Sequence, residues 1–235
     1  MKRMFVIVAL LAAWPIAAGA QTPRTPPVPP APQIPPVPPI PPTPRVLLPD
    51  LDMTINDAMR QARESLANID MNQIHNALDI AQRVHLDLPD MRLDTLPHVE
   101  INAVVEQHVR DFAAECVYTP HPDVNRDHRA LFDSVAVATR PAPGQTVTRL
   151  YTYAPTSSTE WTPAALNWFV PNWFVEITGT IERKVAAFAH YETERRDYPH
   201  PRSERAIRAA AEFYGASCGC EHAEPFVLVR GLESV

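Results

Sequence analysis

Residues 121–131, HPDVNRDHRAL, concentrate side chains that can bind a metal or move a proton. Two histidines and two aspartates fall within eight positions: His121, Asp123, Asp127 and His128. Imidazole is a common zinc ligand, and a neighbouring carboxylate can fix the orientation of the ring. The stretch therefore indicates part of a zinc site, with His128 as the candidate ligand.

Asp127 and His128 stand where a helix is predicted to begin. The free amides and the dipole of a helix N-terminus favour an anionic substrate group or developing negative charge. An alternative interpretation needs no chemistry, because Asp127 could simply cap the helix while His128 is an exposed residue of its first turn. This stretch alone leaves both interpretations open.

A strand, a helix and a second strand surround this stretch in the predicted fold. The strands are Cys116–Thr119 and Leu150–Tyr153, and the helix runs from about His128 to Thr139, with Leu131, Val135 and Ala138 facing inward. Such a unit predicts a parallel sheet, and ligands bind at the carboxyl ends of its strands. The loop 120–127 occupies that position.

Further elements are predicted on both sides of this unit. A helix over 99–112 has Val99, Ala103, Val104, His108 and Phe112 near one side. Trp173–Ile177 is predicted as a strand, residues 179–195 and 203–215 as helices, and Phe226–Val229 as a final extended segment. Trp168 and Trp173 stand beside apolar partners and are predicted to be core residues.

Residues 1–20 are predicted to be a secretory signal. Lys2 and Arg3 precede an apolar segment, Phe5–Ala18, and Ala18-Gly19-Ala20 suits signal peptidase. This pattern predicts an exported protein, periplasmic or secreted. The alternative is an uncleaved anchor, which would be the protein's contact with a membrane.

Three segments follow the predicted signal. Residues 21–45 are rich in proline and predict an extended polyproline II linker. Residues 46–84 are predicted as a helical segment that forms either a hairpin of two short helices or one broken helix. Apolar residues recur at helical spacing in 54–69 and again at Ile74, Leu78, Ala81 and Val84. The α/β domain is assigned to residues 85–235.

Charge and cysteine content narrow the possible partners. The formal net charge of −6 argues against a nucleic-acid surface. Three cysteines leave an odd thiol, and Cys116 is predicted to be a small buried hydrophobe. Cys218 and Cys220 are too close in sequence for an easy disulfide, and a metal clip there lacks a second ligand pair at zinc spacing.

Six segments carry a resemblance to a known family. They are LPDMRLDTLP (88–97), DVNRDHRALFDSVAVATRP (123–141), PTSSTEW (155–161), NWFVEITGTIERKVAAFAHYE (172–192), YPHPRS (198–203) and AIRAAAEFYGASCGCEHAEPF (206–226). In order and spacing, the chain from about residue 85 resembles the PIG-L or LmbE-like zinc-dependent de-N-acetylases.

The resemblance implies a fold and an activity. The fold would be a Rossmann-like α/β sandwich with a parallel sheet, here truncated at its N-terminal side. The activity would be hydrolysis of an N-acetyl group from a glucosamine-type sugar or glycoconjugate. His128 would ligate zinc, and Asp127 would support the catalytic histidine or the metal.

The resemblance also assigns residues to the substrate. Asp90 and Arg92 would contact the substrate or brace the loop, and His200 would reach the sugar pocket. Asn125 takes the position where some members carry a general-acid histidine, and His121 is the replacement candidate for the proton donor. Glu160 and Trp161 could line the pocket rim, although an exposed acid and a packing tryptophan are equally ordinary interpretations.

One family feature is absent from the sequence. A His-Pro-Asp-Asp-Glu type loop, which would supply two more zinc ligands and the base, does not occur, so zinc is expected to bind weakly or not at all. His85, Asp87 and Asp90 are the candidates for a rebuilt site.

Three functional hypotheses follow. The chain is an exported deacetylase completed by another chain or by a non-family site, a non-catalytic sugar-binding or scaffold module, or a poorly folded fusion product. In the last case an exposed sheet edge would promote self-association.

Overall fold

The computed structural model describes residues 4–6, 71–86 and 88–233. The chain divides into two compact units, residues 1–12 with 68–235 and residues 13–67, and all described residues belong to the first. The predicted proline-rich linker and the predicted helix over 54–69 lie outside them. Among the helices described here, none has the length and apolar character that a membrane span requires.

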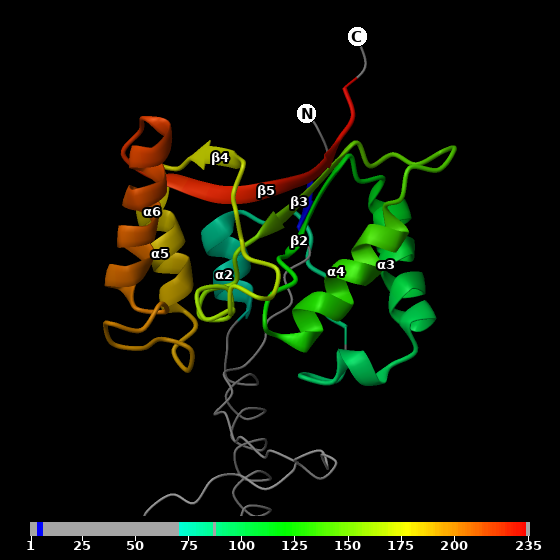
Figure 1. The fold of residues 1–235 in the computed structure, drawn as a ribbon, viewed down its shortest axis with the longest axis horizontal. Helices are drawn as coiled ribbons and strands as arrows, with labels where there is room; N and C mark the ends of the chain where they lie inside the picture. Colours follow the sequence, from blue (N-terminus) through cyan, green and yellow to red (C-terminus); the bar gives the residue numbers. More distant parts are fainter. Residues whose placement is uncertain (1–3, 7–70, 87, 234–235) are drawn as a thin grey trace, which may run out of the picture. The chain divides into compact units, whose positions relative to one another are not determined.

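Strands and helices are interspersed along the described chain (Figure 1). The elements are β1 (Met4–Val6), α2 (Met71–Leu78), the 3-10 helix η1 (Leu93–Thr95), α3 (His98–Phe112), β2 (Cys116–Pro120), α4 (Arg126–Ala138), β3 (Arg149–Tyr153), β4 (Trp173–Glu176), α5 (Ile181–Ala189), α6 (Glu204–Cys218) and β5 (Ala223–Gly231). The predicted α/β class is confirmed.

The strands form one sheet in the order β1-β2-β3-β5-β4. β2 is parallel to β3, in a register that pairs Cys116 with Arg149 and Pro120 with Tyr153, so the predicted strand–helix–strand unit is confirmed. β5 runs antiparallel to both β3 and β4, so the expectation of a wholly parallel sheet is wrong. A single helix between two strands carries the chain back to the end of the sheet where the first strand began, so the next strand runs parallel to it. Two helices lie between β4 and β5, so β5 starts at the end where β4 finished and runs antiparallel to it.

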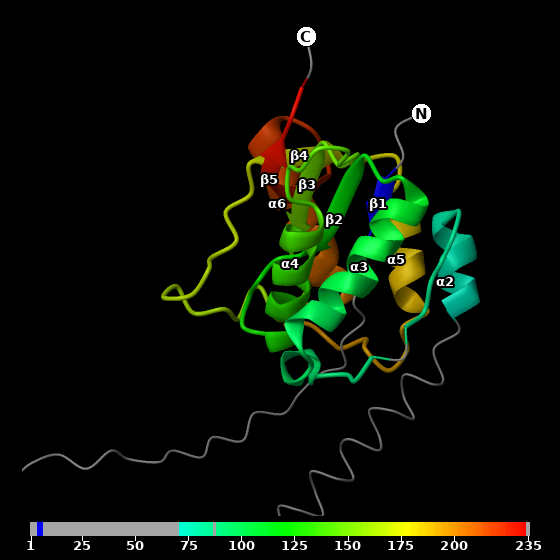
Figure 2. The same ribbon diagram turned by 90° about the vertical axis from the view of Figure 1, so that its right-hand side faces the viewer.

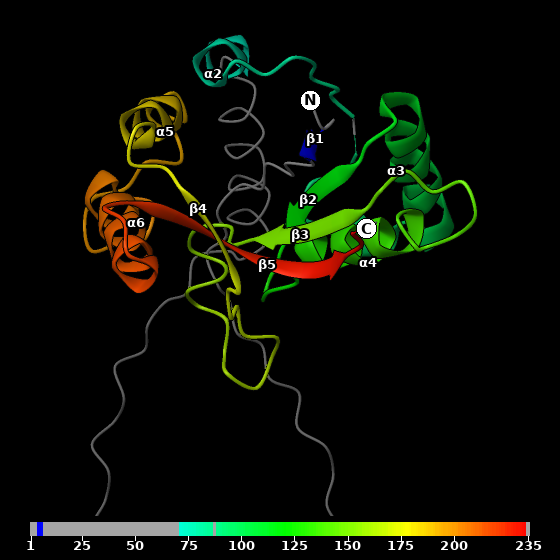
Figure 3. The ribbon, with the colours of Figure 1, turned by 90° about the horizontal axis from the view of Figure 1, so that it is seen from above.

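Helices cover both faces of the sheet. Figure 2 shows α3 and α4 in front of the strands, with α5 and α6 behind them. The main core lies on the α3–α4 side, where Val117 and Leu150 of the sheet meet Leu131 and Val135 of α4. Figure 3 shows α2 beside α5, and Arg183 Nε donates a hydrogen bond of 2.7 Å to the carbonyl oxygen of Ala77.

The inward face of α4 is as predicted, but that of α3 is not. Leu131, Val135 and Ala138 are all buried. In α3 the buried residues are Ile101, Val105 and Val109, whereas Val99 is 72% exposed. Apolar residues occur on both sides of α3, and the packing against α4 selects the side that presents three β-branched residues at spacings of four.

The predictions for the end of α2 and for two tryptophans are wrong, whereas the prediction for Cys116 is confirmed. α2 ends at Leu78, so the helix predicted to reach Val84 does not continue beyond a left-handed Asp79. Trp168 and Trp173 are exposed and not core residues, since they stand on the long β3–β4 connection and on the edge strand β4. Cys116 is buried, as predicted.

Candidate functional site

The loop between β2 and α4 lies at the carboxyl end of β2, where the sequence predicted a site. The His121 amide donates to the carbonyl oxygen of Tyr153 at 2.8 Å, which extends the β2–β3 pairing into the loop. Asn125 caps α4, because its side-chain oxygen accepts a 2.8 Å hydrogen bond from the Asp127 amide. The cap is therefore Asn125, and the expectation that Asp127 serves as the cap is wrong.

His128 is buried and held by Asp123. His128 Nδ1 lies 2.8 Å from Asp123 Oδ1, and the two side chains are 3% and 0% exposed. The same carboxylate accepts hydrogen bonds from the Asn125 amide at 2.9 Å and from Thr159 Oγ1 at 3.0 Å. A carboxylate on Nδ1 leaves Nε2 as the nitrogen available to a ligand, and Nε2 has no hydrogen-bond partner among the described residues.

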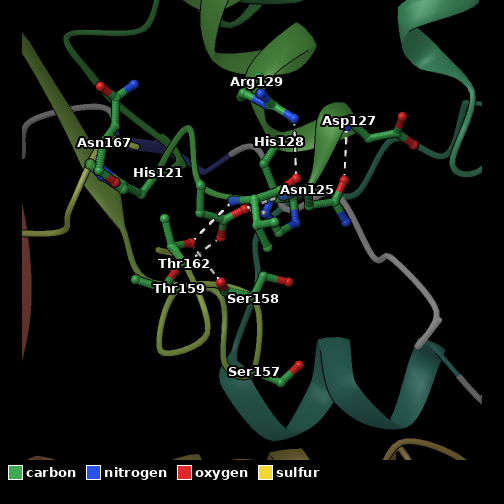
Figure 4. Close-up of polar contacts among 12 residues, drawn as sticks. His121, Asn125, Asp127, His128, Arg129, Ser157, Ser158, Thr159, Thr162 and Asn167 are labelled. Atoms are coloured by element: carbon green, nitrogen blue, oxygen red, sulfur yellow. Dashed lines mark hydrogen bonds and ion pairs between the residues drawn. The ribbon is translucent and has the colours of Figure 1, made fainter. Parts of the chain in front are cut away.

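Asp127 faces a different segment. Figure 4 shows its carboxylate pointing away from His128. Its Oδ1 accepts a 3.0 Å hydrogen bond from the Leu93 amide, which ties η1 to the first turn of α4. Burial raises the pKa of this carboxyl group. Asp123 therefore holds the ring of His128, and Asp127 braces the segment before α3.

The segment before α3 carries two more of the predicted residues. Asn125 Nδ2 donates a hydrogen bond of 3.6 Å to Met91 Sδ. The chain between Asp90 and Arg92 therefore lies beside the start of α4. Asp90 is half-buried, and the exposed Arg92 precedes η1. The structure thus brings 90–92 close to the N-terminus of α4, whose first turn contains His128.

His121 lines a cavity separate from the His128 contacts. The cavity has a volume of about 470 Å³ and is open to solvent; its lining includes Phe132, Leu166, Trp168 and Val227. His121 Nε2 lies 3.2 Å from the Asn167 carbonyl oxygen, and Nδ1 lies 3.2 Å from Thr152 Oγ1. Since a carbonyl oxygen can only accept, Nε2 carries the proton and the neutral ring satisfies both contacts.

We expect His121 to make the protein less stable in mild acid. Burial lowers the pKa of His121, so below about pH 6.5 the unfolded chain binds a proton that the folded chain does not. The free energy of unfolding should therefore fall as the pH drops from 7 towards the lowered pKa. Urea unfolding of the wild type and of His121→Asn at several pH values measures this, and the variant should lose less stability.

An exposed histidine provides the control for this pH effect. His98 stands at the exposed start of α3, and His98→Asn should retain the wild-type pH dependence. Identical pH profiles for the wild type and His121→Asn would contradict the assignment.

The connection after β3 closes over the same loop. Thr162 Oγ1 accepts from the Val124 amide at 3.1 Å and donates to the Ser158 carbonyl oxygen at 2.8 Å. Together with the bond from Thr159 to Asp123, these contacts fix the connection against the carboxyl end of β2 (Figure 4). The loops that follow the neighbouring strands β2 and β3 therefore build one site.

Trp161 and His200, two of the predicted pocket residues, pack against each other. Their rings lie 5.1 Å apart, edge to face, and Trp161 is 58% exposed. The Arg202 amide donates to His200 Nδ1 at 3.0 Å, while Arg202 pairs with the buried Glu194. Glu160 accepts a 2.6 Å hydrogen bond from the Ser157 amide. The indole of Trp161 therefore stays exposed to solvent while its neighbours are held in place.

The described residues do not fit a catalytic zinc ion. Catalytic zinc normally takes three protein ligands, and no group of three His, Cys, Asp or Glu side chains gathers in the described ranges. Of the candidates for a rebuilt site, His85 is exposed and lies in no strand, whereas Asp87 lies outside the described residues. His128 supplies a single imidazole.

The fold of this chain has relatives among solved structures. No family model matches, and no curated protein is similar in sequence. The fold is an α/β fold shared with a solved deacetylase structure.

Two solved structures define this similarity. The conserved protein TT1542 from Thermus thermophilus aligns with a TM-score of 0.57 and 25% identity, over 73% of this chain and 76% of that protein. The N,N'-diacetylchitobiose deacetylase from Pyrococcus horikoshii aligns with a TM-score of 0.52 and 20% identity, over 68% of this chain and 61% of that enzyme.

Sequence reasoning names Asp123 in the loop without assigning it to His128, and it misses Thr159. Asp127 is the immediate neighbour of His128 in sequence, which makes it the more obvious partner. A helical residue, however, points away from the residue that precedes it, whereas a loop residue before the cap can fold back over the first turn. Nothing in the sequence marks Thr159, which reaches Asp123 from the β3–β4 connection.

Proposed function

We propose that this chain is an exported, deacetylase-like protein that binds an N-acetylated sugar or glycoconjugate and does not hydrolyse it by itself. The observation that carries the proposal is His128, held by a buried carboxylate at the carboxyl end of β2 with Nε2 free of protein partners in the described structure. Ligands of open α/β sheets bind at the carboxyl ends of the strands, and the fold is shared with a chitobiose deacetylase.

The surface around His128 suits a sugar. Trp161 offers an exposed aromatic face, and His200 holds it from the edge. Hydroxyl and amide groups of a sugar can bond to nearby polar side chains while the ring packs on the indole. The side chains of Asn125 and Arg92 lie on neighbouring segments and complete the proposed substrate contacts.

Hydrolysis would need groups that His128 does not supply. Activation of water by zinc requires further ligands and a base. Beyond the described residues, the acidic side chains within 7–70 and at 87 are Asp50, Asp52, Asp57, Glu64, Asp70 and Asp87, and these ranges contain no histidine or cysteine. A zinc-dependent deacetylase completed by carboxylates is the second candidate function.

Calorimetry with N,N'-diacetylchitobiose, with and without zinc, tests the proposal when acetate release is measured in the same samples. We expect binding to the full chain without zinc, and no acetate. Trp161→Ala should weaken binding about fivefold, because one aromatic contact contributes about 1 kcal/mol. Phe213→Ala is the matched control, since Phe213 is a similarly exposed aromatic residue on α6.

Three different results would contradict the proposal of sugar binding without hydrolysis. Release of acetate that requires zinc and is lost in His128→Ala would establish hydrolysis and refute the proposal. Equal weakening by Trp161→Ala and Phe213→Ala would show that the sugar does not use the predicted surface. A chain with no measurable affinity for the disaccharide would exclude this substrate class.

A further inference from the structure

Cys218 and Cys220 lie side by side at the end of α6, remote in sequence from the His128 site. Their Sγ atoms are 3.6 Å apart, and both cysteines are free thiols. Gly219 between them has φ +84°, the left-handed conformation that ends α6. This turn brings the two side chains to the same side of the chain, although they are only two residues apart.

The two thiols differ in their surroundings. Cys218 is exposed, and its Sγ lies 3.2 Å from the Tyr214 carbonyl oxygen. Cys220 is partly buried and donates to the His222 carbonyl oxygen at 3.4 Å. Burial raises the pKa of the Cys220 thiol, which also hydrogen-bonds to Cys218. Cys218 is therefore the accessible nucleophile and Cys220 the neighbour placed to resolve its oxidation.

We propose that Cys218 and Cys220 form a reversible redox site that closes to an intrachain disulfide by exchange with a low-molecular-weight disulfide. The thiolate of Cys218 attacks one sulfur of the reagent, forming a mixed disulfide and releasing one reagent thiolate. Cys220 then loses its proton, attacks the Cys218 sulfur and releases the second. The cysteines together lose two electrons and two protons, and the reagent disulfide becomes two thiols.

The short loop makes this disulfide easy to reduce. A disulfide prefers Cα atoms about 5.5–6 Å apart, and a bridge across one residue closes a small ring that cannot relax freely. Strained disulfides have more oxidising potentials and are the labile ones. Closing the bond also removes the S–H donors to Tyr214 and His222. The pair is thus suited to switching between two states and unsuited to permanent stabilisation.

The buried Cys116 provides an internal reference. It lies on β2 at 5% exposure, so an external disulfide cannot reach it in the folded protein. Trypsin separates the two sets of thiols, because residues 111–126 carry Cys116 and residues 209–230 carry both Cys218 and Cys220. A single digest therefore reports on both.

The test equilibrates the full chain in glutathione buffers from reducing to oxidising, traps free thiols by alkylation and measures both peptides by mass spectrometry. We expect peptide 209–230 to lose two hydrogens and all alkylation in oxidising buffer, and to recover both thiols in reducing buffer. Peptide 111–126 should remain alkylated after denaturation in every sample. Cys220→Ser should instead hold glutathione on Cys218.

Three results would overturn the proposal. They are two free thiols in peptide 209–230 at the oxidising limit, glutathione bound to both cysteines of the wild type, and a disulfide-linked dimer on a non-reducing gel. Cys116→Ala serves as the matched control and should leave the oxidation of peptide 209–230 unchanged. The wild-type measurement stands alone if a variant fails to fold.

Discussion

Asp123→Ala should lower the free energy of unfolding by about 3–5 kcal/mol. Asp123 is completely buried and accepts from His128 Nδ1, from the Asn125 amide and from Thr159 Oγ1. Alanine removes all of these acceptors at once, and water cannot replace them around a buried imidazole. Because small domains are stable by about 5–15 kcal/mol, the loss should be visible as a large shift of the urea midpoint.

Two milder substitutions separate the contributions of the individual hydrogen bonds to Asp123. Asp123→Asn retains one acceptor oxygen and the shape of the side chain, so we expect about half the loss. Thr159→Val removes one donor without changing the volume and should cost about 1 kcal/mol. If Asp123→Ala were no more harmful than Thr159→Val, the carboxylate would not hold His128, and the basis of the proposed site would fail.

Gly215→Ala should destabilise the protein by about 2–3 kcal/mol, even though alanine is the better helix former by about 1 kcal/mol. Gly215 lies in α6, buried against the turn that leads into β5. A Cβ atom there would stand 2.5 Å from the Glu221 carbonyl oxygen and 2.7 Å from that of Cys220. Both neighbours are backbone atoms, so no side-chain rotation can relieve the overlap.

Gly179→Ala is the matched control for this substitution. A methyl group at Gly179 would meet no atom within 4 Å, and the residue has no positive φ, so alanine should be neutral or slightly stabilising. Thermal and urea unfolding of both variants give the comparison. Equal stability of Gly215→Ala and Gly179→Ala would mean that α6 does not pack closely on residues 220–221.

The position of the site could be predicted from the sequence, because it follows from local order. A buried strand, Cys116–Pro120, is followed by a polar loop and an amphipathic helix, and this order alone puts the loop at the carboxyl end of the strand. The buried face of α4 could also be predicted, since Leu131, Val135 and Ala138 follow one another at helical spacing.

Other features depend on contacts between distant segments. α3 has apolar residues on two sides, so its buried face is selected by α4 and not by its own pattern. Trp168 and Trp173 are apolar in type but lie on a long connection and an edge strand, where they stay exposed. The bond of Thr159 to Asp123 spans 36 residues, and no periodicity in the sequence indicates it.

The edge strand β1 lies within the predicted signal sequence, so export would change the edge of the sheet. Met4–Val6 pair with Cys116, Val117 and Tyr118 of β2, yet they belong to the segment predicted to be cut after Ala20. Proteolytic maturation would therefore remove the edge strand β1 from the sheet. The backbone N–H and C=O groups of β2 that pair with β1 would then be exposed. The precursor and the mature polypeptide would then differ in their tendency to exchange strands between copies.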